Sequence, residues 1–569
     1  MSKLFLLSAL ALCTATAPLS AQTTLTVNTH LHDQVTLTIR DGEKWYGGAV
    51  NDAHQAPFRD GYTLNLYGDT RGNQASPLLI STKGRIIWSE EPLEFSFKDH
   101  QLLISQSRGS LATGSASRRT TASTSDSISS SPGGIIIDST GRDLREAFRI
   151  AAKRFFPSVN KLPDTLLFSS PQYNTWIELV YNQNQQDILS YARSIIDNGF
   201  PPGVLMIDDN WADYYGRFDF RKDRFANAAA MIDSLHQMGF KVMIWISPFV
   251  SPDTEVFREL LGNKLLLLSN DGDTTLTWAK AEKPAICSWW NGYSAALDLS
   301  NPSARQWLEG RLQHMVSAYH IDGFKLDAGD ADLYPANALP SQPSTPNDYS
   351  RLWGEIGLHF PLNEYRAMWK MGGQPLVQRL RDKQHTWTDL QKLIPHITMA
   401  GLLGYQFTCP DMIGGGEFGS FRDTKILDEA LIVRSAQCSA LMPMMQFSVA
   451  PWRVLSAPHL AIVRSMVELR KKYTPYILQL AREAAWTGEP IVRSMEYVFP
   501  NQGFAEEKGQ FMLGSKYLVA PVVAKDGEKE IHLPKGKWKS DKEEILQGPR
   551  ILKMQVPLDR LPVYELLGG

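Results

Sequence analysis

Nearly continuous apolar runs alternate with helical segments between residues 143 and 486, and this alternation constrains the fold more than any other feature. We expect strands at 165–168, 203–208, 241–246, 375–378 and 401–407, and helices at 143–155, 185–198, 227–238, 304–319 and 459–485. Such a pattern is typical of an α/β fold with a parallel sheet covered by helices. The length favours a (β/α)8 barrel, or TIM barrel, over residues 143–486. A doubly wound sheet is the alternative, although no G-x-G-x-x-G fingerprint follows the first strand.

Strand-rich regions flank this segment on both sides. Residues 22–142 alternate apolar and polar side chains in short runs between turn residues, which predicts an N-terminal β-sandwich. Within it, residues 105–134 are mostly Ser, Thr, Ala, Gly and Arg, and we expect a flexible loop there. Beyond the long helix, short strands with Gly, Pro and Asp turns predict a small C-terminal β-sandwich domain over residues 487–569.

The first 21 residues have the pattern of a cleaved signal peptide. Lys3 precedes an apolar run that ends at Cys13, and small residues lead to a cleavage position before Gln22. We therefore expect a protein exported to the periplasm or secreted. Leu12 does not match the small residue that a lipoprotein site needs, so no lipid anchor is expected. No later segment reaches eighteen consecutive apolar residues, so we expect no membrane span.

Composition narrows the classes of partner and cofactor. The formal net charge of -2 gives no electrostatic reason to expect a nucleic acid partner. After cleavage, the remaining cysteines, Cys287, Cys409 and Cys438, are too few and too scattered for a disulfide framework or a zinc site. The sequence therefore predicts a small-molecule or sugar substrate and no metal or other cofactor. It leaves the oligomeric state open.

The segment 321–330 reads Ile-Asp-Gly-Phe-Lys-Leu-Asp-Ala-Gly-Asp, an apolar strand that ends in carboxylates. Because strand side chains alternate between two faces, Lys325 and Asp327 share one face. An ammonium group beside a carboxylate at the end of a buried strand favours an ionised, nucleophilic aspartate. We expect structural roles for the neighbouring Asp322 and Asp330.

Polar side chains also end the other apolar strands, where a barrel carries its chemistry. Asp208 and Asp209 end one strand and Trp245 the next, while Asp411 lies on a glycine-rich loop whose backbone can approach a ligand closely. One acid beside Lys325 and another among apolar neighbours can have pKa values shifted in opposite directions, as acid/base chemistry on glycosides requires. Aromatic residues near the strand ends fit either core packing or a platform for a sugar ring: Trp211, Trp245, Trp289, Trp290 and Phe407.

The order of these motifs resembles glycoside hydrolase family 31, the retaining α-glycosidases, from about residue 25 to the end of the chain. The matching segments are 205–209 (LMIDD), 242–249 (VMIWISPF), 289–292 (WWNG), 297–302 (LDLSNP), 322–327 (DGFKLD), 410–415 (PDMIGG), 488–500 and 511–521. The resemblance implies that Asp327 is the nucleophile and Asp411 the general acid/base. It also implies that Lys325 keeps Asp327 ionised, and that Arg379 contacts ring hydroxyls or orients Asp411.

Within the family, the chain most closely resembles the myogenesis-regulating glycosidase group, which is similar to α-galactosidases. The segment 378–383 (QRLRDK) replaces the Arg-Ser-Gly of α-glucosidases, and no Gln-Gln-Arg-Trp signature of sulfoquinovose-cleaving members is present. The resemblance implies an exo-acting α-galactosidase, with an α-glucosidase as the second interpretation and an inert sugar-binding relative as the third. It implies that Asp208 and Asp209 contact the substrate and that Trp245 and Trp290 wall the pocket.

Overall fold

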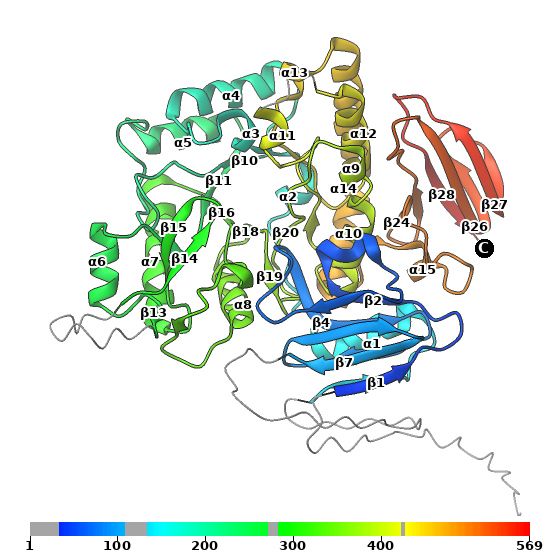
Figure 1. The fold of residues 1–569 in the computed structure, drawn as a ribbon. Helices are drawn as coiled ribbons and strands as arrows, with labels where there is room; N and C mark the ends of the chain where they lie inside the picture. Colours follow the sequence, from blue (N-terminus) through cyan, green and yellow to red (C-terminus); the bar gives the residue numbers. More distant parts are fainter. Residues whose placement is uncertain (1–33, 108–133, 271–282, 423–426, 569) are drawn as a thin grey trace, which may run out of the picture.

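The computed structural model describes residues 34–107, 134–270, 283–422 and 427–568 (Figure 1). The predicted signal peptide, residues 1–21, lies outside the described residues. So does most of the predicted flexible loop at 105–134, of which residues 108–133 are not described. Within the described ranges, no helix is both long and apolar enough to cross a membrane.

Parallel strands of the middle segment form a nearly closed barrel. Within the described residues its sheet has eight strands in the order β21-β20-β18-β16-β11-β10-β9-β22. The strands are β9 Gln172–Asn174, β10 Val204–Ile207, β11 Lys241–Ile246, β16 Gly323–Leu326, β18 Leu362–Tyr365, β20 Gln378–Arg379, β21 Thr408–Cys409 and β22 Gln446–Phe447. At the seam between the first and last strands of that order, the Ile413 amide donates to the Gln446 carbonyl at 2.9 Å. The predicted TIM barrel is therefore confirmed, and the doubly wound alternative is excluded.

Helices follow the strands and lie around the sheet (Figure 1). The longer ones are α1 Leu144–Phe155, α4 Gln185–Asp197, α5 Ala228–Gln237, α7 Pro302–Tyr319, α8 Pro346–Ile356, α10 Leu393–Leu402, α12 Glu429–Ala440 and α14 Ala457–Thr487. Helix α4 shows why such segments are helical. Its N-cap Asn184 accepts a hydrogen bond from the Asp187 amide, and Ile188, Ala192 and Ile195 bury one face at helical spacing.

Three of the predicted strands differ from the structure. Residues 165–168 lie in the short helix α2 Leu166–Ser169, and the first barrel strand starts only at Gln172. The run 401–407 begins inside α10, and Gly404, with φ +88°, turns the chain toward β21. The predicted strand 375–378 is found as β20, which begins at Gln378. Short apolar runs fit a buried helix as well as a strand, because periodicity alone does not separate the two.

The N-terminal region consists of mainly antiparallel sheets that meet the barrel. One has the order β1-β7-β6-β3, and the other has β19-β4-β5-β8 with β2 paired to β4. The strands are β1 Gln34–Thr38, β2 Trp45–Ala49, β3 Thr63–Asn65, β4 Gln74–Ser81, β5 Ile86–Trp88, β6 Leu93–Lys98, β7 Gln101–Gln106, β8 Ile136–Asp138 and β19 Met368–Trp369. Because β19 follows barrel strand β18 and pairs in parallel with β4, the barrel segment supplies the edge of an N-terminal sheet.

The C-terminal region is a sheet in the order β23-β24-β25-β28-β26-β27. Its strands are β23 Val492–Arg493, β24 Phe511–Leu513, β25 Tyr517–Val519, β26 Glu528–Ser540, β27 Ile545–Gln555 and β28 Val563–Gly568. Met512, Ile531, Trp538 and Tyr564 belong to a buried cluster separate from the main core. The small C-terminal β domain is thus present, while the domain limits 22–142, 143–486 and 487–569 stay predictions.

Arg470 of α14 ties the helix to the bottom of the barrel. Its buried guanidinium donates to the carbonyls of Met442 at 2.8 Å and Pro443 at 2.5 Å, just before β22. It also donates to the carbonyl of Phe168 at 2.6 Å, just before β9. Burial lowers the pKa of Arg470 to about 10. One side chain therefore links the segments that precede β9 and β22, which also pair with each other through their backbones.

We expect Arg470→Met to destabilise the fold by about 3 kcal/mol, because buried carbonyls lose their donor. The midpoint of thermal unfolding measures this effect. Lys471→Met is the matched control, since the Lys471 side chain is 80% exposed and neighbours Arg470 in sequence. Equal midpoints for both variants would contradict the proposed bracing role of Arg470.

Candidate active site

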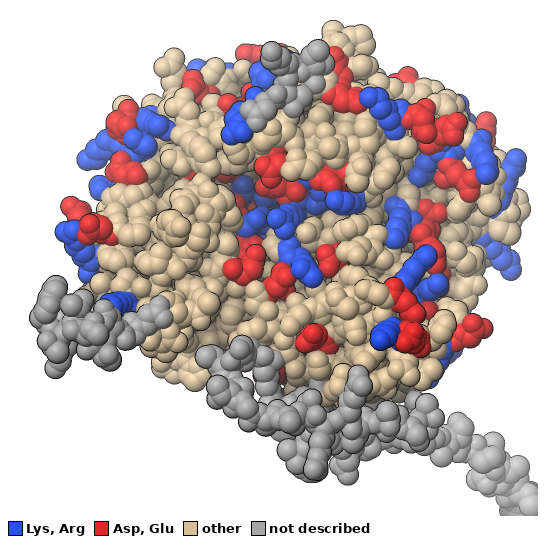
Figure 2. Space-filling view, in the orientation of Figure 1, with Lys and Arg blue, Asp and Glu red and all other residues tan. Residues whose placement is uncertain are grey.

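A cavity of about 300 Å³ lies at the C-terminal ends of the barrel strands. Figure 2 shows basic and acidic side chains crowded together in a hollow near the centre of the view. Of the residues predicted from the sequence, the cavity brings together Asp208, Asp209, Trp245, Trp290, Lys325, Asp327 and Arg379. It also takes in side chains that were not predicted: Trp176, Tyr181, Arg366, Arg381, Asp382, Met412, Glu417 and Phe418.

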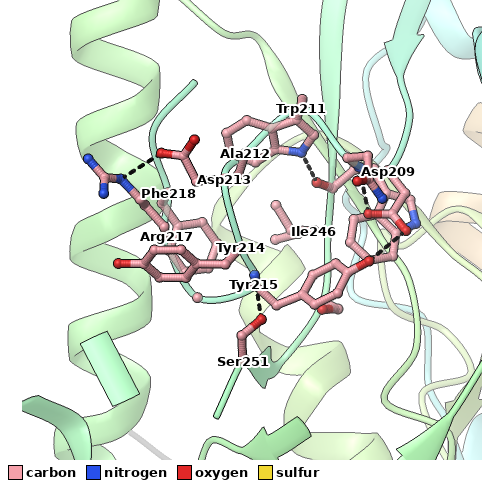
Figure 3. Close-up of a pocket in the computed structure, with 14 residues that line it drawn as sticks. Asp209, Trp211, Ala212, Asp213, Tyr214, Tyr215, Arg217, Phe218, Ile246 and Ser251 are labelled. Carbon is pink, nitrogen blue, oxygen red and sulfur yellow. Dashed lines mark hydrogen bonds and ion pairs between the residues drawn. The ribbon is translucent and has the colours of Figure 1, made fainter. Parts of the chain in front are cut away.

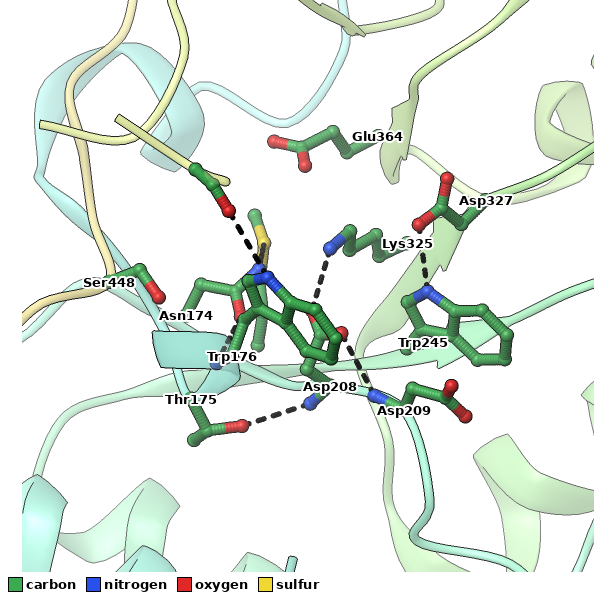
Figure 4. Close-up of polar contacts among 12 residues, drawn as sticks. Asn174, Thr175, Trp176, Asp208, Asp209, Trp245, Lys325, Asp327, Glu364 and Ser448 are labelled. Atoms are coloured by element: carbon green, nitrogen blue, oxygen red, sulfur yellow. Dashed lines mark hydrogen bonds and ion pairs between the residues drawn. The ribbon is translucent and has the colours of Figure 1, made fainter. Parts of the chain in front are cut away.

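Asp327 follows β16 and lies in a polar cradle (Figure 4). The Trp245 indole N–H donates to its Oδ2 at 2.9 Å, and the Arg366 Nε lies 3.0 Å from its Oδ1. Burial alone would raise the pKa of Asp327, but Arg366 and then Lys325 outweigh it and hold the pKa well below its usual range. The carboxylate is therefore ionised at neutral pH.

Lys325 does not make the contact expected from its place in the sequence. Its ammonium donates to Asp208 Oδ2 at 2.6 Å, after β10, and acts on Asp327 only as the second positive charge after Arg366 (Figure 4). The register explains the difference. Leu326 pairs with Tyr365 of β18, so the next residues, Asp327 and Arg366, lie at the same level. The direct partner of Asp327 therefore comes from the adjacent strand.

Arg366 connects several parts of the site. Besides Asp327, its guanidinium binds Asp330 Oδ2 at 2.6 Å, and it stacks on the ring of Trp290 at 4.4 Å. Trp290 is 46% exposed, so it stands at the mouth of the cavity. The sequence did not predict Arg366, because the strand before it was not recognised. That strand, β18, contains the charged residue Glu364, which the sequence pattern does not associate with a buried strand.

Asp208 and Asp209 follow β10, as predicted, and have different partners. Asp208 is paired with Lys325, whereas Asp209 accepts hydrogen bonds from the Tyr215 hydroxyl at 3.0 Å and the Asn291 amide at 2.5 Å. Burial, together with the charge of Asp208, raises the pKa of Asp209 to about 7. Asp209 is therefore a carboxyl group that can exchange a proton near neutral pH.

Asp411, predicted as the general acid/base, lies behind the cavity wall. It is 1% exposed and is absent from the described residues that line the cavity. Its Oδ1 accepts from Arg379 at 3.1 Å, and its Oδ2 accepts from the amides of Lys383 at 2.6 Å and Gly416 at 2.9 Å. These donors leave little of the carboxyl group free for a substrate.

Asp382, which sequence reasoning missed, occupies the position facing the cavity. It follows β20, lines the cavity, and its side chain is 29% exposed. The same Arg379 amino group binds both Asp382 and Asp411, so the two carboxyls form a coupled pair. Burial and the neighbouring Asp382 charge raise the pKa of Asp411 to about 7. Arg379 outweighs burial at Asp382 and lowers its pKa, so the pair retains one proton close to neutral pH and Asp411 carries it.

Gly416 packs against this pair, and its lack of a side chain allows both carboxyls to approach. A Cβ atom there would lie 2.7 Å from Asp411 Oδ1 and 2.9 Å from Asp382 Oδ1, closer than real Cβ contacts. We expect Gly416→Ala to lower kcat/KM by about 10²-fold, because a displacement of about 1 Å at reacting groups has an effect of that size.

Gly419→Ala is the control for this prediction, since a Cβ there would meet nothing closer than 3.6 Å. Kinetics with an aryl α-glycoside and the thermal midpoint should be measured for both variants. Unchanged kcat/KM in Gly416→Ala would show that the carboxyl pair tolerates displacement.

Comparison with known proteins places the chain in a family. Residues 169–480 match the glycosyl hydrolases family 31 TIM-barrel domain, and residues 488–567 match the glycosyl hydrolase family 31 C-terminal domain. The chain is 32% identical over 431 residues to myogenesis-regulating glycosidase from Mus musculus, covering 74% of this chain and 59% of that protein. It is 22% identical over 421 residues to Alpha-glucosidase 2 from Bacillus thermoamyloliquefaciens, covering 68% and 51%. The chain thus spans between half and three fifths of the length of these relatives.

A solved structure shares the fold. The GH31 dextranase of Flavobacterium johnsoniae, complexed with glucose, matches with a TM-score of 0.78 and 20% sequence identity, over 94% of this chain and 66% of that one. The TIM-barrel family model alone covers more than half of the chain. The chain therefore belongs to glycoside hydrolase family 31.

Proposed function

We propose that the protein is an exo-acting retaining α-glycoside hydrolase. The supporting observation is a site with carboxyl groups in opposite protonation states. Arg366 and Trp245 hold Asp327 as an anion, while the pair formed by Asp382 and Asp411 retains a proton near neutral pH. Glycoside hydrolysis with retention needs this combination of an ionised nucleophile and a protonated acid.

The proposed reaction has two steps. Asp327 attacks the anomeric carbon, the bond from that carbon to the leaving oxygen breaks, and the carboxyl pair protonates the leaving oxygen. Water then attacks the anomeric carbon of the glycosyl ester and gives its proton to the pair, which releases Asp327. Two inversions produce net retention of configuration.

We assign delivery of the proton to Asp382 and revise the role of Asp411. Asp382 faces the cavity, whereas Asp411 lies behind its wall and both of its oxygens already accept hydrogen bonds from protein groups. Asp411 then serves as the partner that stores the proton, and Arg379 holds the two carboxyls together.

We propose an α-galactoside as the substrate, with an α-glucoside as the second candidate. The resemblance to the myogenesis-regulating glycosidase group supports the first. A curated relative that is named an α-glucosidase supports the second. Asp208, paired with Lys325, and the aromatic walls Trp245 and Trp290 supply the polar and apolar surfaces that a sugar ring needs.

A panel of aryl α-glycosides tests this function. We expect turnover of the α-galactoside to exceed that of the α-glucoside, and Asp327→Ala to lose more than about 10⁴-fold in kcat, because the proposed reaction forms the glycosyl ester on Asp327. Asp233→Ala, at an exposed carboxylate that pairs with His320, is the control. Equal activity of Asp327→Ala and the wild type would refute the nucleophile, whereas sugar binding without turnover of any glycoside would favour an inert binder.

Replacing each acid of the pair distinguishes their roles. We expect Asp382→Asn to lose about 10²- to 10⁴-fold in kcat on glycosides with poor leaving groups, but to keep activity on a glycosyl fluoride, which needs no protonation. Azide should then replace water in the second step and give an α-glycosyl azide. Asp411→Asn should show no such azide rescue; rescue by azide in Asp411→Asn alone would return the acid role to that residue.

The pH profile provides a second readout for the same variants. Since the acid must carry its proton, kcat of the wild type should fall as pH rises through about 7, the pKa of the pair. Asp382→Asn should lack this alkaline limb. Asp209→Asn should retain it, although Asp209 also has a pKa near 7.

A further inference from the structure

A second cavity adjoins the catalytic one, beside the chain that follows β10 (Figure 3). It has a volume of about 170 Å³ and is bounded by Trp211, Tyr214 and Phe218, with Ile246 and Ser247 from the end of β11. Its wall also includes Asp209 and Trp245, which line the catalytic cavity as well. The two spaces therefore meet at one shared wall.

Hydrogen bonds close that wall. Tyr215 and Asn291 both bind Asp209 Oδ2, and the Asn291 amide also donates to the Tyr215 hydroxyl at 2.9 Å. On the other side, the Trp211 indole N–H donates to the Trp245 carbonyl at 2.7 Å. A molecule in the second cavity would be separated from Asp327 by this set of bonded side chains.

Several polar side chains line the second cavity, and they retain hydrogen-bonding capacity for a ligand. Ser247 is only 5% exposed, and its hydroxyl makes no hydrogen bond to any described residue. Ser251 accepts from the Tyr215 amide at 3.0 Å, which leaves its own proton to donate. Asp213 and Arg217 add a charged pair at 3.5 Å. Hydroxyls and a carboxylate among aromatic faces are the chemistry that recognises a sugar ring.

The volume of the second cavity limits the size of such a sugar. A cavity of about 150 Å³ holds one benzene ring in an engineered protein, so a space of this order has room for at most one sugar ring and excludes an oligosaccharide. We propose that the second cavity binds one free monosaccharide, separately from the ring that is cleaved. The proposal rests on the proposed function, because hydrolysis would supply such a monosaccharide next to this wall.

A ligand in this pocket would contact a side chain that also holds the proposed nucleophile, Asp327. Trp245 lines both cavities, and its indole N–H holds Asp327. A sugar packed against Trp245 or Trp211 therefore contacts the side chains that fix the position of the reacting carboxylate.

The test first blocks the catalytic cavity. The full-length protein is treated with 5-fluoro-α-galactosyl fluoride or its gluco isomer. Asp327 displaces the C1 fluoride, forms an ester with C1 and releases fluoride ion, and intact mass spectrometry confirms the label. Saturation-transfer NMR then reports whether free galactose or glucose binds the labelled protein. Absence of the label would count against the proposed function, whereas labelling without sugar binding would overturn only the second pocket.

Variants then locate the bound sugar. We expect the NMR signal to persist in the labelled wild type and in Ala230→Leu, an exposed position on α5. It should disappear in Ala212→Leu, which fills the pocket, and weaken in Ser247→Ala, which removes the unpaired hydroxyl. Turnover without added monosaccharide should be unchanged in Ala212→Leu. An undiminished signal in both pocket variants, with thermal midpoints like that of the wild type, would overturn the proposal.

Discussion

The anionic state of Asp327 depends on a guanidinium that the barrel carries on the neighbouring strand. Burying a carboxylate costs several kcal/mol unless it is paired and hydrogen-bonded. Arg366 provides the pairing and Trp245 the hydrogen bond. Arg366 is in turn neutralised by Asp330, so the positive charge is balanced inside the protein. The chemistry of the site therefore rests on the lateral register of β16 and β18, which sets these groups at one level.

The barrel and the position of Asp327 were predictable from the sequence because both produce strong local patterns. Asp327 and Asp208 end apolar strands, and the structure places both in the catalytic cavity. Arg366 was not predictable, because its strand contains a buried charged residue, Glu364, that is satisfied only by distant partners such as Gln446. Asp382 was not predictable from the sequence either. Its cavity-facing position follows from the path of the loop after β20, which no periodicity encodes.

The N-terminal region contributes to the site although it carries none of the proposed catalytic groups. Strand β19 fixes the chain beyond Arg366 by pairing with β4. The Arg381 guanidinium donates to the carbonyl of Arg71 at 3.3 Å, so the loop that presents Asp382 rests on the N-terminal region. The barrel thus supplies the proposed catalytic groups, while the region before it restrains the loops that carry them.

The position of Arg470 affects the order in which the chain can fold during synthesis. Its guanidinium is the donor that the carbonyls preceding β9 and β22 share, and it lies on a helix that starts only at Ala457. As a ribosome makes the protein from its N-terminus, every barrel strand emerges before this donor does. Strands β9 and β22 can pair early, but the brace between the segments that precede them forms only after α14 has left the exit tunnel. The segments that precede β9 and β22 are therefore braced only after all eight barrel strands of the described chain have been synthesised.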